Sequence, residues 1–142
     1  MTATLLTGLA RTTEPQTALR RFLALDAVVT GGNGLIYLAA AGPVGRLIGV
    51  GPVFLTALGA VLTVYGAAVG LLAAREQPAA LVVKAVVDIN LVYAVLSVAA
   101  LALWLDPTTA GVVWIPLQAL IVAGFAVLQF LALAARAARN TA

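Results

Sequence analysis

Four long apolar runs, separated by short polar breaks, dominate this sequence. They predict membrane-spanning helices over residues 22–41, 53–73, 79–105 and 112–135. Each run reaches the roughly 20 residues that a helix needs to cross a ~30 Å hydrocarbon core. Charged residues make up only 9% of the chain, whereas an average soluble domain carries about 25%. We therefore expect a single membrane domain with an all-α fold, a transmembrane four-helix bundle whose outer surface meets lipid.

Proline and glycine mark the ends of these predicted helices. The first helix is expected to begin near Pro15 in the headgroup layer and to end at Gly42-Pro43. Residues 44–50 are expected to form a short interfacial turn, and residues 106–109 to end the third helix and cap the fourth. Pro116 is expected in the first turn of the fourth helix, where a missing N–H is tolerated. Short connections favour sequential antiparallel neighbours, an up-down-up-down order.

Basic residues lie mainly on one side of the predicted spans. Only Arg46 falls on the side opposite to the others, which are Arg11, Arg20, Arg21, Arg75, Lys84, Arg136 and Arg139. Lysine and arginine are enriched in cytoplasmic segments. The sequence therefore predicts a multi-pass protein of the cell (inner) membrane with both termini in the cytoplasm.

The two halves of the chain, residues 14–76 and 78–139, have a similar layout. Gly51 and Gly111 each open a related apolar segment that ends in Ala-Ala-Arg, and Asp26 and Asp88 precede those arginines by nearly equal distances. This pattern predicts two parallel hairpin repeats related by an axis along the membrane normal. Chance similarity between apolar segments is the alternative interpretation.

A polar stripe runs along the first predicted helix. Steps of four, three and four residues place its members on one helical face; they are Asp26, Thr30, Asn33 and Tyr37. One interpretation is a binding or conduction surface. The other is helix packing, in which the glycines beside Asn33 admit a neighbouring backbone and the Asn33 amide bonds across the interface. Packing is the simpler explanation of the two.

The second predicted helix carries a continuous seam of small residues. Its members alternate at steps of three and four residues; they are Thr56, Gly59, Thr63, Gly66 and Gly70. Such seams let membrane helices approach closely, so we interpret this one as a packing surface. The sequence leaves open whether it packs within one bundle or against a second copy.

Several polar side chains lie inside the predicted spans and form a candidate intramembrane polar site. They are Asp26, Asn33, Tyr37, Lys84, Asp88, Asn90 and Gln129. Counting about 1.5 Å per residue places Asp26, Asp88 and Gln129 at similar depths below the cytoplasmic boundary. If both acids share Lys84, one of them is left uncompensated and is a candidate proton carrier. Alternatively, each acid pairs with its own basic neighbour near the interface.

The chain resembles a known kind of protein. The resemblance lies in its length, its four spans, the starts flanked by arginine (Arg20-Arg21) and a composition rich in Ala, Val, Leu and Gly. Small uncharacterised integral membrane proteins of actinobacterial type share these features, and the outline is similar to that of DoxX-like four-helix proteins. The resemblance covers nearly the whole chain and rests on architecture. It implies a four-helix membrane fold and assigns no functional residue.

The side-chain inventory narrows the function classes. The chain has no cysteine and no histidine, which removes disulfides, thiol chemistry and the usual haem, zinc and copper ligands. Its basic residues are not clustered with aromatic ones, so the pattern does not favour nucleic-acid binding. We therefore expect no metal, no cofactor and no enzymatic activity; a lipid-modifying enzyme is disfavoured because no nucleophile accompanies the acids.

Two functions remain as predictions. The first is a non-enzymatic membrane protein that acts through helix association, as a homo-oligomer or with a membrane protein partner. Its basis is the seam of small residues. The second is a small proton-coupled transporter or ligand carrier that uses Asp26 and Asp88.

Overall fold

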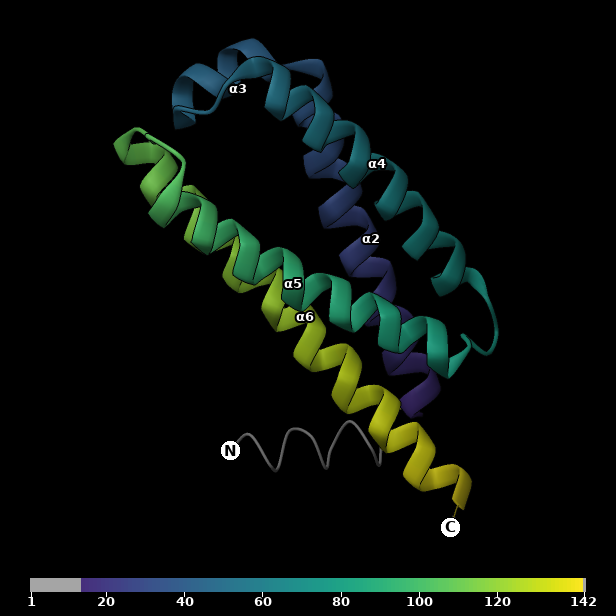
Figure 1. Cartoon of the computed structure of the whole chain (residues 1–142). Coiled ribbons are helices and arrows are strands. Elements are labelled where there is room, and N and C mark those ends of the chain that lie inside the picture. The colour runs from purple at the N-terminus through teal and green to yellow at the C-terminus, as the bar shows by residue number, and fades with distance from the viewer. Residues whose placement is uncertain (1–13, 142) are drawn as a thin grey trace.

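The computed structural model describes residues 14–141, which form five helices (Figure 1). In chain order they are α2 (Pro15–Ala39), α3 (Ala41–Ile48), α4 (Pro52–Ala74), α5 (Ala80–Leu103) and α6 (Thr109–Thr141). All except α3 are long and apolar enough to cross a membrane. The prediction of an all-α fold built on four long apolar helices is confirmed.

The long helices are arranged as two hairpins. Helices α2 and α4 pack along each other, with the short α3 between them in the chain, and α5 packs on α6 (Figure 1). Contacts between α2 and α6 join the hairpins. Because the spans alternate in direction, the start of α2, the end of α4, the start of α5 and the end of α6 lie at the same end of the bundle. We call it the terminal end.

Two proline positions differ from the sequence-based expectation. Helix α2 ends at Ala39, so Gly42 and Pro43 lie in the first turn of α3 and do not terminate a helix at that point. Pro43 is tolerated there because the first N–H groups of a helix have no intrahelical partner. Helix α6 starts at Thr109, which places Pro116 in its third turn. Pro116 therefore leaves the Val112 carbonyl without its usual intrahelical donor.

Glycines bring the backbones of α2 and α4 into direct contact. A Cβ added at Gly66 would lie 2.6 Å from the Gly31 Cα, and one added at Gly34 would lie 2.6 Å from the Thr63 backbone nitrogen. Gly59 likewise faces the Gly34 carbonyl oxygen, which would lie 2.8 Å from an added Cβ. The seam of small residues on α4 therefore packs against α2 of the same chain.

The ends of the seam are looser. Gly70 is half-buried, and an added Cβ would meet the Ala27 Cβ at an ordinary 3.6 Å. Thr56 is exposed and donates its hydroxyl to the Pro52 carbonyl at 2.7 Å. The close backbone contact thus occupies the middle of α4.

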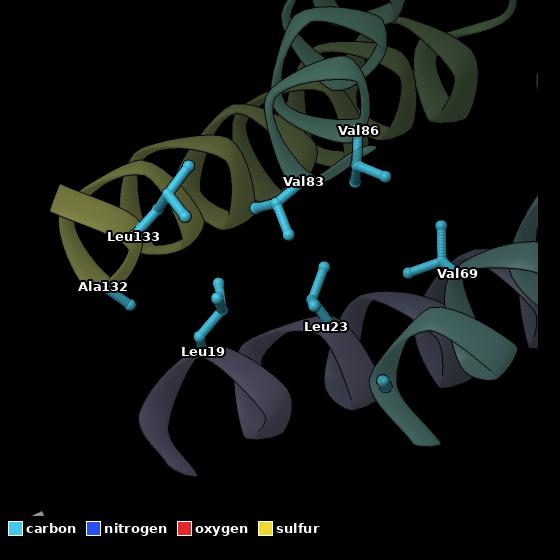
Figure 2. Packing of buried hydrophobic residues seen from close by; sticks show 8 residues of the cluster. Leu19, Leu23, Val69, Val83, Val86, Ala132 and Leu133 are labelled. Atoms are coloured by element: carbon cyan, nitrogen blue, oxygen red, sulfur yellow. The ribbon is translucent and has the colours of Figure 1, made fainter. Parts of the chain in front are cut away.

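An apolar core fills the terminal end, and all four long helices contribute to it (Figure 2). Its buried residues are Leu19, Leu23, Val69, Ala73, Val83, Val86, Ala132 and Leu133. Two arginines donate hydrogen bonds to backbone carbonyls at the edge of this core. Arg20 Nε donates to the Ala73 carbonyl at 3.0 Å, and Arg136 Nη1 donates to the Pro78 carbonyl at 2.7 Å. The Ala73 carbonyl belongs to the last turn of α4, where carbonyls lack helical partners.

The opposite end is closed by α3 and the start of α6. The Thr108 N–H donates to the Ile48 carbonyl at 3.2 Å, which ties the turn before α6 to the end of α3. Gly49 has φ 78°, a left-handed conformation that glycine adopts without strain. A hydrogen bond of 2.8 Å from Trp114 Nε1 to the Tyr37 hydroxyl then joins α6 to α2.

Candidate functional site

One hydrogen-bonded cluster contains side chains from all four long helices. Asp26 and Thr30 come from α2, Tyr65 from α4, Asn90 from α5 and Gln129 from α6. Asp26 and Gln129 are fully buried, with 0% exposure, and Asn90 is 2% exposed. Polar side chains at this depth are costly unless they bond to one another. We call this group the Asp26 cluster.

The Asp26 carboxyl group is held by neutral donors. Its Oδ2 accepts hydrogen bonds from Asn90 Nδ2 at 2.8 Å and Gln129 Nε2 at 2.7 Å, and its Oδ1 accepts one from Thr30 Oγ1 at 2.8 Å. The Tyr65 hydroxyl donates to Asn90 Oδ1 at 3.0 Å, which fixes the orientation of that amide. Within residues 14–141 no basic side chain forms an ion pair with Asp26. The carboxyl is therefore hydrogen-bonded but has no cationic partner there.

This geometry can hold a carboxylate or a carboxylic acid. Both lone-pair directions of Oδ2 are engaged by amide donors, so a proton on Asp26 would sit on Oδ1. A hydroxyl can donate or accept. Thr30 can therefore donate to the ionised group and accept from the protonated one, and the two amide bonds to Oδ2 are the same in both cases.

An apolar cavity of about 410 Å³ adjoins the Asp26 cluster. It lies between the two hairpins, and α2, α4, α5 and α6 all line it. Thr30, Tyr65 and Asn90 belong both to the cluster and to the cavity wall. Ile36 and Val61 line the cavity and are also exposed, by 55% and 64%, so the cavity opens onto the surface that faces lipid.

One polar side chain on the cavity wall has no partner among the described residues. Asn33 lines the cavity, and its amide forms no hydrogen bond within residues 14–141. Tyr93 lies on the same wall, but its hydroxyl interacts with the Ser97 side chain. Lipid offers no donors or acceptors to an amide. Water or a ligand inside the cavity would satisfy the Asn33 amide.

A second cavity of about 380 Å³ continues toward the α3 end. Tyr93 and Gln118 line both cavities, so the two adjoin. Tyr37 and Trp104 line only the second one. Tyr37 thus belongs to the far end of the bundle and not to the Asp26 cluster.

The structure separates the residues that the sequence grouped as one polar site. Asp26, Asn90 and Gln129 meet in the cluster, and Asn33 lies on the cavity wall. Lys84 and Asp88 are exposed on the outer side of α5 and contribute to neither. The reason is helical rotation: Asp88 is two residues before Asn90, about 200° around the helix.

The same separation bears on the predicted repeat. Asp26 and Asp88 occupy equivalent places in the two halves, yet Asp26 is fully buried and Asp88 is exposed. Helix α3 in the first half has no helical counterpart between Leu103 and Thr109 in the second. The repeat stays a prediction about the sequence, and the two acids have different surroundings.

Tyr65 is the member of the cluster that sequence reasoning missed. It lies ten residues before Arg75, and Asp26 lies eleven residues after Pro15, the expected start of the first helix, so the two depths are similar. A tyrosine at matching depth in an antiparallel neighbour was the available signal. The sequence did not show which way the Tyr65 side chain points around its helix, because the glycine seam on the same helix favoured an interpretation as a packing surface.

Among residues 14–141 the acidic side chains form no group of three or more that could hold a metal ion. No family model, curated protein or solved structure matches this chain. The chemistry of the Asp26 cluster and its cavity is therefore the basis of the function proposed below.

Proposed function

We propose that the protein is a membrane-embedded carrier that binds a small lipophilic molecule in the cavity between its hairpins. The cavity of about 410 Å³ beside the Asp26 cluster is the observation that carries this proposal. Small-molecule sites typically have volumes of about 300–1,000 Å³, apolar walls and a few convergent polar groups. The opening toward lipid gives such a molecule a route from the bilayer.

The wall chemistry indicates the kind of ligand. An apolar body would fit against aliphatic residues such as Val29 and Ile121. A single hydrogen-bonding group on the ligand would satisfy the Asn33 amide, which lacks a partner among the described residues. A ligand of this class binds without covalent chemistry, in keeping with a non-enzymatic protein.

In this proposal Asp26 is the only acidic side chain at the site among residues 14–141, and we assign any proton coupling to it. It is buried without a cationic partner there, and its Oδ1 bonds to the Thr30 hydroxyl, a group that can donate or accept. Asp88 has no part in the carrier, because it is exposed on the outer side of α5. Association through the α4 seam loses its support, since that seam packs on α2 of the same chain.

The test uses tryptophan as a reporter of cavity occupancy. The chain has two tryptophans, of which Trp114 lines the main cavity. In a Trp104→Phe variant in nanodiscs, energy transfer from Trp114 to N-phenyl-1-naphthylamine should show a saturable, one-to-one component above partitioning into lipid. Purely linear transfer with no saturation would count against a binding site.

Filling the cavity should abolish that component. An added Cβ at Gly32, on the cavity wall, and at the exposed Gly124 of α6 would meet no atom within 4 Å. Gly32→Leu should therefore fold normally and lower the affinity for the probe at least about tenfold, because the leucine occupies ligand volume. Gly124→Leu is the matched control and should bind as the parent does. Equal binding by both variants would place the probe outside the cavity.

We also propose that both termini face the cytoplasm, because the basic residues are biased toward the terminal end. Arg46 and Arg75 are exposed at opposite ends of the bundle and the chain has no cysteine, so Arg46→Cys and Arg75→Cys form a clean pair. A membrane-impermeant maleimide added to intact cells should label only the Arg46→Cys protein. Labelling of only the Arg75→Cys protein would reverse the orientation.

A further inference from the structure

The outward face of α5 carries two side chains of opposite charge where contact with lipid is expected. The buried side of α5 is formed by Val83, Val87, Asn90 and Ala94. Asp88 lies on the opposite side and is exposed, about 12 Å along the helix from Ala80. Lys84, one turn earlier, is also exposed. Both side chains thus point away from their own bundle.

Such charges are expensive when they face hydrocarbon. Ionisable residues within membrane spans almost always face protein or a water-filled cavity, or pair with one another. Within residues 14–141 neither Lys84 nor Asp88 forms an ion pair or a side-chain hydrogen bond. A protein surface that covers this face would remove the cost.

The residues around Asp88 form a regular seam. Its members are exposed or half-exposed and repeat at steps of four and three; they are Leu81, Ala85, Asp88, Val92, Val95 and Ala99. A period of 3.5 residues is that of two helices wound around each other with a left-handed supercoil. Apart from Asp88 the seam is apolar, and Lys84 flanks it beside Ala85. A single polar position within such a seam fixes the register of the pair.

We propose that this α5 seam is a homodimer interface, in which Lys84 of each copy pairs with Asp88 of the other. Two copies inserted in the same orientation bring identical seams together around a two-fold axis along the membrane normal. Two lysines and two aspartates then form a neutral group at the centre. The charge pattern is self-complementary, so a second copy of this chain is the partner it fits. The interface is independent of the proposed carrier, because it lies on the outside of the bundle.

Single cysteines test this interface directly, since the chain contains none of its own. Val92 on the seam and Val64 on α4 are 56% and 71% exposed and lie at similar depths, twelve residues after Ala80 and eleven before Arg75. In native membranes, copper phenanthroline should cross-link Val92→Cys into a disulfide-linked dimer and leave Val64→Cys monomeric. Equal cross-linking of the two proteins would overturn the interface.

A charge swap tests the pairing. In the Val92→Cys background, Asp88→Lys should lower the dimer yield at least about tenfold, because it brings like charges together. Adding Lys84→Asp should restore the yield by reversing both signs. These side chains are exposed, so the fold of each chain should persist, which circular dichroism and probe binding can check. The pairing would be overturned if the Lys84→Asp/Asp88→Lys protein stayed monomeric, or if the dimer yield did not change with the charges at these two positions.

Discussion

Replacing Gly66 with alanine is expected to lower the free energy of unfolding by about 2 kcal/mol, the net of overpacking and helix propensity. An added Cβ would lie 2.6 Å from the Gly31 Cα and 2.7 Å from its nitrogen. Both atoms are backbone, so α2 and α4 must separate to make room. Overpacking of this kind costs about 3 kcal/mol, and the better helix propensity of alanine returns up to about 1 kcal/mol. Titration with sodium dodecyl sulfate in bicelles measures the change.

Gly70 is the matched control on the same seam. There an added Cβ would meet the Ala27 Cβ at 3.6 Å, which is ordinary contact. Gly70→Ala should therefore be as stable as the parent or up to about 1 kcal/mol more stable. Neither effect should depend on protein concentration, because both concern packing within one chain. Equal stabilities of the two variants would show that α2 and α4 are not in backbone contact at Gly66.

Replacing Asp26 with leucine is also expected to lower the free energy of unfolding by about 2 kcal/mol. The substitution removes the acceptor of three hydrogen bonds and leaves Gln129 Nε2 without a partner. The unfolded helices stay in the membrane or detergent, so the measurement chiefly reports the lost bonds. The same detergent titration measures it.

Asp26→Asn provides the control with the same shape. Its carbonyl can accept from Asn90 and Gln129, and its amide can donate to Thr30, so the loss should stay below about 0.5 kcal/mol. Adding Gln129→Leu to Asp26→Leu should cost less than the two single changes together, because the bond between these side chains is lost only once and Gln129 Nε2 is no longer left without an acceptor. The difference should stay below about 1 kcal/mol, since Asn90 Nδ2 loses both of its acceptors in the double variant. Additive costs, or a destabilised Asp26→Asn protein, would contradict the cluster as described.

Local properties of the chain made part of the site predictable. The stripe of Asp26, Thr30, Asn33 and Tyr37 follows from helical spacing alone, and depth counting grouped Asp26 with Gln129. The structure bonds Asp26 to Thr30 and Gln129. Depth counting also grouped Asp88 with them, because depth is a distance along the helix axis and carries no information about direction around it.

Direction around each axis depends on contacts between segments far apart in the sequence. Gly31 and Gly34 set it for α2 by facing α4, and the polar stripe lies about 100° further around the helix, toward the other hairpin. The polar stripe therefore faces the other hairpin, whereas the glycines face α4. The two sequence interpretations, packing and binding surface, describe two faces of one helix.

The sequence by itself determined the four apolar spans, their order and their helical periodicity, because hydropathy and spacing are properties of contiguous residues. Only the tertiary structure decided which faces meet. It placed the α4 seam against α2, gathered Asp26, Asn90 and Gln129 beside a cavity, and left Asp88 outside. The physical reason is that lipid is as apolar as the helices themselves, so close packing and hydrogen bonds between distant segments fix the rotation of each helix.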